Sequence, residues 1–205
     1  MFKTILKEIL KLYGTLIVFF LMKTVLEQLL DKSLSIPQHE AFKYNTPLIA
    51  FLTFIKIGIF SPVIEEFSFR FGLFSKRNNQ IISILFFAVP FFYHAEIELF
   101  NSSFYYFYSI LLLYALSLYF IPKQKHLLLI IVNSILFGLI HMLNFASLSK
   151  ENILLALINI IPQILAGYFL ANLKYKKGFS YSVFFHIMLN SIAFLLNLAM
   201  SFGQK

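Results

Sequence analysis

Two adjacent carboxylates and an arginine lie in an apolar stretch of the chain, where charged side chains are rare. They are Glu65, Glu66 and Arg70. Arg70 follows Glu66 by four residues, so a helix places both on one face and the guanidinium can neutralise that carboxylate. Glu65 points about 100° away from this pair, which leaves it suited to take a proton from water near neutral pH. The other interpretation of the segment is a structural ion pair that fixes the helix in register.

Two histidines occupy two further apolar stretches. His186 precedes Asn190 by four residues, so an imidazole and a carboxamide lie on one face, where they could bind a metal, a water or a developing oxyanion. His141 follows Gly138, which lets a neighbouring helix approach closely. Each motif also has a simpler explanation, a satisfied core histidine for His141 and a hydrogen-bonded pair between helices for His186 and Asn190.

The composition places these polar residues in a membrane protein. Of 205 residues, 60% are hydrophobic and 13% are charged, and the mean hydropathy is +0.81. A soluble domain is about 45–50% apolar and about 25% charged. A charged side chain at the centre of a bilayer costs at least about 2.5 kcal/mol, so an intramembrane ionisable residue is a functional candidate. The chain contains no cysteine, which excludes a thiolate nucleophile, a disulfide framework and cysteine-based zinc sites.

Apolar runs separated by short polar stretches predict an all-α fold, a polytopic helical bundle of about seven transmembrane helices, within a range of six to eight. Positive and neutral or acidic connections alternate along the chain, as seven crossings from a cytoplasmic N-terminus require. The third run is short and could be re-entrant, and Pro62 could kink or split the second. We expect residues 1–205 to form one membrane-embedded domain, with the motifs at 62–190. The predicted helices are 5–30, 46–75, 80–95, 103–121, 126–147, 152–173 and 178–201.

The remaining charged residues indicate orientation rather than chemistry. The net charge is +8, but lysines and arginines lie at the ends of apolar runs, as in cytoplasmic loops, so we expect no nucleic-acid binding. We expect a solvated or paired face along one end of the first helix, and polar loops or interfacial positions for the other ionisable side chains. A cluster near the end of the third run has metal-ligand residue types, but its spacing of two suits a strand better than a helix and nothing nearby completes a site, so we expect a solvated interfacial loop. These residues are Lys23, Glu27 and Asp31, then His39, Glu40 and His126, and finally the cluster His94, Glu96 and Glu98.

The order and spacing of the three motifs resemble those of the CPBP family of intramembrane proteases, which comprises CAAX proteases and bacteriocin-processing enzymes and is also called the Abi family. That family is marked by EExxxR, FxxxH, and HxxxN or HxxxD on successive membrane helices. Here the first motif is Glu65, Glu66 and Arg70, and the others are Phe137 with His141 and His186 with Asn190. Phe71 departs from the glycine that many members have after the arginine, which concerns packing more than chemistry.

The resemblance implies hydrolysis of a peptide bond in or at the edge of the membrane. By this analogy Glu65 and His141 activate a water, His186 and Asn190 stabilise the oxyanion, and Glu66 and Arg70 shape the site. It leaves open whether no cofactor is needed or a divalent metal such as zinc is held by Glu65, His141 and His186. The implied substrate is a bacteriocin leader, a pheromone precursor or a CAAX-like C-terminus, and the implied location is a bacterial plasma membrane.

Two other classes of function remain to be separated from proteolysis. One is a self-immunity or interaction protein that binds a bacteriocin or its receptor without catalysis. The other is a small transporter with a buried proton relay, for which inverted repeats would be expected, and none is visible in the sequence. The seven-span arrangement also raises a geometric question. It places Glu65 toward the cytoplasmic half of its helix and His141 toward the outer half of its own, so the motifs meet only if helices tilt or the second run bends at Pro62.

Overall fold

The computed structural model describes residues 2–31, 33–35, 46–93, 102–145 and 152–203, and every regular element in these ranges is a helix. The all-α prediction is therefore confirmed for the described residues. The elements, in chain order, are α1 (Phe2–Leu30), α2 (Pro47–Thr53), the π-helix η1 (Phe54–Phe60), α3 (Ser61–Phe69), α4 (Arg77–Tyr93), α5 (Ser102–Phe120), α6 (His126–Ile140), the 3₁₀-helix η2 (His141–Asn144), α7 (Ile153–Asn159), α8 (Ile161–Lys177) and α9 (Phe179–Gly203).

Several of these helices have the length and apolarity that a membrane crossing requires. Four qualify within the described residues, and a fifth is added if the bent pair α7–α8 counts as one span. The prediction of about seven spans is not confirmed, because α5 is apolar only over a shorter length and α4 has 17 residues. At 1.5 Å per residue, 17 residues rise about 25 Å, less than the roughly 30 Å of a hydrocarbon core. The four spans are Lys3–Leu30, Pro47–Phe69, His126–Asn144 and Phe179–Ala199.

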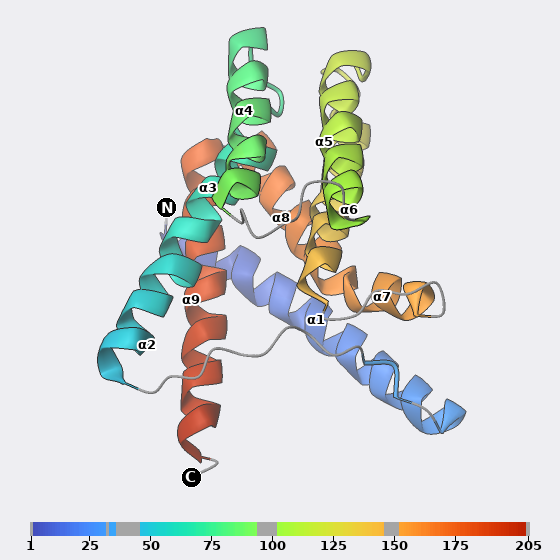
Figure 1. Cartoon of the computed structure of the whole chain (residues 1–205), viewed down its shortest axis with the longest axis vertical. Helices are drawn as coiled ribbons and strands as arrows, with labels where there is room; N and C mark the ends of the chain where they lie inside the picture. Colours follow the sequence, from blue (N-terminus) through green and yellow to red (C-terminus); the bar gives the residue numbers. More distant parts are fainter. Residues whose placement is uncertain (1, 32, 36–45, 94–101, 146–151, 204–205) are drawn as a thin grey trace.

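The second predicted run forms one continuous helix whose middle is wound as a π-helix. It consists of α2, η1 and α3 in succession (Figure 1). Pro62 has no N–H and cannot donate to the carbonyl four residues before it, so the regular α-helical bonding fails at this point. The N–H of Ser61 instead reaches back five residues, to the carbonyl of Lys56. The helix therefore contains a wide turn immediately before the residues of the first motif, and a π-helical turn is a recognised source of helix bending.

Helices α6 and α8 pack closely because each presents a glycine to the other. An ideal Cβ placed on Gly138 of α6 would lie 2.2 Å from the Cγ1 atom of Ile164 on α8. A Cβ placed on Gly167 of α8 would lie 3.2 Å from the Cα atom of Ser134 on α6. Small residues at such positions allow the close helix contacts that stabilise membrane proteins. The expectation that Gly138 admits a neighbour is confirmed.

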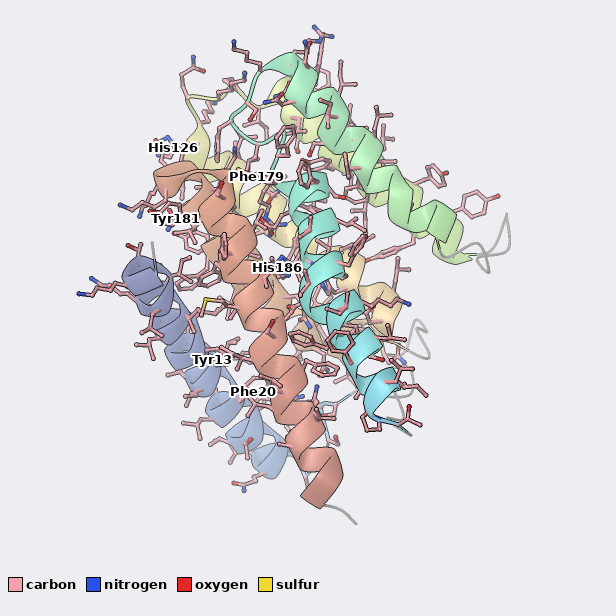
Figure 2. The ribbon with its side chains drawn as sticks, turned by 90° about the vertical axis from the view of Figure 1, so that its left-hand side faces the viewer. Tyr13, Phe20, His126, Phe179, Tyr181 and His186 are labelled. Atoms are coloured by element: carbon pink, nitrogen blue, oxygen red, sulfur yellow. The ribbon has the colours of Figure 1, made fainter. Side chains whose placement is uncertain are left out.

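Basic loops from three parts of the chain meet at one end of the bundle. Lys123 donates a hydrogen bond to the carbonyl of Ser75, and His126 stacks on Tyr175 with ring centroids 4.5 Å apart. Phe179 at the start of α9 lies at the same end, as does the beginning of α1 (Figure 2). The positive clusters thus gather on one side, as the charge pattern predicted.

Two residues of the predicted polar face of α1, Lys23 and Glu27, are paired, and Asp31 is exposed. Lys23 donates to Ser35 at 3.1 Å and to Asn159 of α7 at 3.0 Å, and it lies 3.9 Å from Glu27. Glu27 in turn accepts from the backbone N–H of Leu34 at 2.8 Å. The predicted loop residues His39 and Glu40, and the cluster His94, Glu96 and Glu98, lie outside the described residues.

Candidate active site

The first motif centres on a completely buried ion pair. Glu66 and Arg70 both have no exposed surface, and the Nε atom of Arg70 lies 3.8 Å from Oε1 of Glu66. The guanidinium also lies 4.1 Å from the centre of the Phe137 ring and 3.4 Å from the carbonyl oxygen of Gly167, to which it donates. A buried charge needs such compensation, since an unpaired one is strongly destabilising. The pair expected from the i, i+4 spacing is therefore present at the junction of α3, α6 and α8.

The third motif is tied directly to this pair. His186 is 5% exposed, and its Nδ1 atom lies 3.0 Å from Oε1 of Glu66. Ser182, one turn earlier on α9, donates to Oε2 of the same carboxylate and lies 3.0 Å from the carbonyl oxygen of Leu170. Glu66 therefore links α3 to α9 through both of its oxygens. Figure 2 labels His186 on the side of α9 that faces the α2–η1–α3 segment.

Glu65 brings all three motifs together. Its Oε1 atom accepts a hydrogen bond from Ser61 at 2.7 Å. Its Oε2 atom lies 3.6 Å from Nε2 of His186 and 4.0 Å from Nε2 of His141, and it has no hydrogen-bond partner among the described side chains. One carboxylate oxygen is thus held by a hydroxyl, and the other faces two imidazole nitrogens from α9 and η2.

The Nδ1 atoms of the two imidazoles have fixed hydrogen-bonding roles. Nδ1 of His141 lies 2.7 Å from the carbonyl oxygen of Phe137, and Nδ1 of His186 lies 3.0 Å from a carboxylate oxygen of Glu66. Oxygen acceptors at both positions require that each Nδ1 carry its proton. The Nε2 atoms, which face Glu65, are then free to accept a proton or, once protonated, to donate one. A histidine oriented by a carboxylate in this way is a common arrangement in catalytic and metal sites.

Asn190 lies one helical turn beyond His186 and contacts the wide turn rather than a carboxylate. Its amide nitrogen donates to the carbonyl oxygen of Ile57 at 3.1 Å. The structure therefore places Asn190 on the same α9 face as His186, as its spacing predicts, but records a backbone partner for it. Among the predicted site residues, Glu65, Glu66, Arg70, His141 and His186 form one connected cluster, and Asn190 borders it.

Three buried polar residues near the site were not identified from the sequence. Helix α3 ends inside the protein, where the carbonyls of its last residues lack helical partners. The hydroxyl of Ser83 on α4 lies within hydrogen-bonding distance of the carbonyl oxygens of Phe67 and Ser68. Tyr114 of α5 and Asn133 of α6 donate to the carbonyl oxygen of Phe69, at 3.1 and 2.9 Å. Side chains from three helices thus cap the element that carries the carboxylates, and a sequence signal for this was absent because single Ser, Tyr and Asn residues are common in apolar runs.

The residue types of the site suit a divalent metal, but the distances between these residues are too long for one. Two histidines and one glutamate are a known zinc-ligand set. Two ligands of one tetrahedral zinc, each about 2.0–2.2 Å from the metal, lie roughly 3.3–3.6 Å apart, whereas Glu65 and His141 are separated by 4.0 Å. Within the described residues, no group of three or more His, Cys, Asp or Glu side chains has the geometry of a metal site.

The fold and site together describe a helical membrane protein with a buried carboxylate–histidine cluster. Comparisons with protein-family models, with curated proteins and with solved structures found no match for this chain. The resemblance to the CPBP family therefore stands on the three motifs alone.

Proposed function

We propose that this chain is an intramembrane endopeptidase of the CPBP type, acting in a bacterial plasma membrane on a membrane-associated peptide or protein. The observation that supports the proposal most strongly is the placement of Glu65, with one oxygen 3.6 Å and 4.0 Å from the Nε2 atoms of His186 and His141. A carboxylate and an imidazole at this separation can hold one water between them, which is the geometry that general base catalysis requires.

The proposed reaction is hydrolysis by an activated water. Oε2 of Glu65 takes a proton from a water that also donates to Nε2 of His141, and the water oxygen attacks the carbonyl carbon of the peptide. The carbonyl oxygen becomes an oxyanion. Protonated His186 stabilises it through Nε2–H, while its Nδ1–H remains hydrogen-bonded to Glu66. The proton on Glu65 passes to the leaving nitrogen as the C–N bond breaks. Arg70 balances the buried charge of Glu66 throughout.

The membrane setting of the site supports a substrate that reaches it from the bilayer. Glu65 lies in the span Pro47–Phe69, and His186 lies in the span Phe179–Ala199. Both are helices whose other faces expose large apolar side chains, such as Phe51, Phe60 and Leu195. The substrate classes that follow from the proposal are a bacteriocin leader, a pheromone precursor or a lipidated C-terminus.

The experiment that tests this proposal compares secreted and membrane-associated peptides by mass spectrometry in three strains. One strain expresses the native chain, one lacks it, and one expresses Glu65→Gln at the same abundance in the membrane. We expect a precursor to accumulate equally in the second and third strains. The Glu8→Gln variant is the matched control, because Glu8 pairs with Lys11 on an exposed face of α1 and should leave processing unchanged. Normal processing by Glu65→Gln would contradict the proposal.

The alternative of a non-catalytic self-immunity or interaction protein makes the opposite prediction. Binding alone requires the shape of the protein but not the proton-accepting oxygen of Glu65. Protection of cells against a bacteriocin that persists in both Glu65→Ala and His141→Ala would support this alternative. Loss of protection in both variants, with the proteins still folded in the membrane, supports proteolysis.

A further inference from the structure

The contact between Asn190 and Ile57 depends on an acceptor that a regular helix would not offer. In an α-helix the carbonyl of Ile57 would accept from the N–H of Ser61, four residues later. That N–H is instead bonded to the carbonyl of Lys56. The next candidate donor in the π-helical pattern is residue 62, which is a proline without an N–H. The carbonyl of Ile57 therefore has no backbone donor from either pattern, and the amide of Asn190 supplies one at 3.1 Å.

A buried glycine, Gly58, lies beside this contact and packs against α9. Gly58 is buried, and a Cβ placed on it would lie 3.5 Å from the hydroxyl of Ser191, the residue that follows Asn190. This is an ordinary van der Waals distance, so α9 and η1 are in direct contact next to Asn190. An unsatisfied carbonyl in an apolar surrounding is unfavourable by several kcal/mol, so this interhelical bond links α9 to η1 at a defined position.

The same two helices carry two reacting groups, His186 and Glu65, farther along the same interface. His186 precedes Asn190 by one turn of α9, and Glu65 follows Ile57 along the η1–α3 helix. The helices run antiparallel, as Figure 2 shows, so the contact between Asn190 and Ile57 and the contact between His186 and Glu65 are successive contacts of one interface. The bond between Asn190 and Ile57 prevents the two helices from sliding along each other. It therefore also sets the contact in which Nε2 of His186 lies 3.6 Å from Oε2 of Glu65.

We propose that Asn190 is a positioning residue, which holds the carbonyl of Ile57 in the wide turn and thereby sets the spacing between His186 and Glu65. The proposal rests on the proposed function, because it assigns Asn190 a role in the same site. It differs from the role that the family resemblance implies, in which the amide touches the substrate oxyanion. Under our proposal, removing the amide alters the distance between Glu65 and His186 even when no substrate is present.

A metal-binding variant measures this spacing without any substrate. Replacing Glu65 by histidine, a side chain of similar reach, brings three imidazoles into the site, and three histidines bind a tetrahedral divalent ion. The native separation of 4.0 Å between Glu65 and His141 exceeds the spacing of two zinc ligands by less than about 1 Å, which side-chain rotation can close. Co²⁺ is the probe, because its visible absorption reports tetrahedral binding directly. The baseline is the Glu65→His, His186→Ala variant, in which one of the three imidazoles is missing. The chain has no cysteine, so no thiolate competes for the ion.

The test then adds Asn190→Leu to the Glu65→His variant and measures the dissociation constant for Co²⁺ in detergent. We expect affinity to fall about tenfold or more, in the range found when groups that orient metal ligands are removed. Asn197→Leu is the matched control, because Asn197 is exposed on the same helix, and it should leave the affinity within about twofold. If Asn190→Leu does not yield folded protein by circular dichroism and gel filtration, Asn190→Ala removes the same donor with a smaller side chain.

The outcomes separate this inference from the proposed function. An unchanged Co²⁺ affinity in Asn190→Leu or Asn190→Ala would overturn the positioning role of Asn190 and leave the proposed peptidase untouched. A Glu65→His variant that binds Co²⁺ no better than the baseline would contradict the meeting of the three motifs, and with it both proposals. A fall of about tenfold that is specific to position 190 supports the positioning role.

Discussion

Glu65 and Glu66 are neighbours in sequence with different surroundings, and this difference suits the two carboxylates to different roles. Glu66 is completely buried, and its two oxygens contact Arg70, His186 and Ser182. Glu65 is about one-quarter exposed in its side chain, and one of its oxygens has no hydrogen-bond partner among the described residues. The first carboxylate is therefore suited to hold helices together, and the second is suited to exchange a proton.

The buried pair gives a prediction about stability. Arg70→Leu leaves the charge of Glu66 without its cation, so we expect the free energy of unfolding to fall by about 3–5 kcal/mol. The double variant Glu66→Gln, Arg70→Leu removes both charges and should recover a large part of this loss. Unfolding titrations in mixed micelles provide the measurement. A double variant as unstable as Arg70→Leu alone would show that the charge of Glu66 is not the cause.

Ser182 gives a second prediction at the same scale. Ser182→Ala removes a hydroxyl that contacts Glu66 and the carbonyl of Leu170, so we expect a loss of about 1 kcal/mol, typical of hydrogen bonds between membrane helices. Ser180→Ala is the matched control, because Ser180 is exposed on the same helix. Equal unfolding free energies for the two variants would remove Ser182 from the network.

The elements bring these residues together through close packing and through one irregular turn. Gly138 and Gly167 let α6 and α8 approach, and His141, which follows α6, lies beside Glu65 in the middle of α3. The wide turn η1 and Pro62 deprive the carbonyl of Ile57 of a backbone donor, and the amide of Asn190 donates to it instead. Buried side chains of α4, α5 and α6 cap the end of α3. Satisfying backbone groups inside the protein is obligatory in a membrane, and here that requirement also orients the site.

Gly138→Ala tests the packing of α6 on α8. The new Cβ would lie 2.2 Å from Cγ1 of Ile164 and 3.3 Å from its backbone nitrogen, so Ile164 and the backbone that carries it must shift. We expect a loss of about 1–3 kcal/mol, as for other overpacked sites, together with loss of precursor processing. Gly14→Ala is the control, because nothing lies within 4 Å of a Cβ there, and it should be neutral or slightly stabilising. Equal stability of the two variants would contradict the close contact.

Pairings within one helix could be predicted from the sequence, whereas pairings between helices could not. The spacing of Glu66 and Arg70 specified their ion pair, because a helix fixes the distance between residues four apart. Nothing in the sequence specified that Asn190 contacts Ile57, because that bond depends on where Pro62 interrupts another helix. The helices 126–147 and 152–173 were also predicted as single elements. In the structure α6 ends at Ile140, and α7 and α8 are bent by 41° at Ile160.

At the scale of the whole molecule, the basic loops gather at one end, and the charge pattern predicts the orientation of that end. The contacts of Lys123 with Ser75 and of His126 with Tyr175 bring the loop after α3, the loop before α6 and the end of α8 together. Basic loops remain on the cytoplasmic side of a membrane. Thr46, immediately before α2, and Asn152, immediately before α7, should then lie on the opposite side.

Single cysteines test this orientation, because the native chain has none. We expect Gln124→Cys and Lys176→Cys to react with a membrane-impermeant maleimide only when the cytoplasmic face is open. Thr46→Cys should react in intact cells. All these positions except Lys176, at the end of α8, lie in loops, so labelling should not disturb the bundle. Labelling of positions 124 and 46 from the same side would contradict the arrangement of spans.

The most direct test of the central claim is cleavage by the purified chain in lipid vesicles. The substrate is the precursor that accumulates without the chain, and the reaction is run in H₂¹⁸O with detection by mass spectrometry. We predict that the native chain and Glu8→Gln release a fragment with one ¹⁸O in its new C-terminal carboxyl, and that Glu65→Gln reconstituted in equal amount releases none. Equal release of the labelled fragment by Glu65→Gln would contradict the assignment of Glu65 as the base. Release of no labelled fragment by the native chain would contradict the peptidase itself.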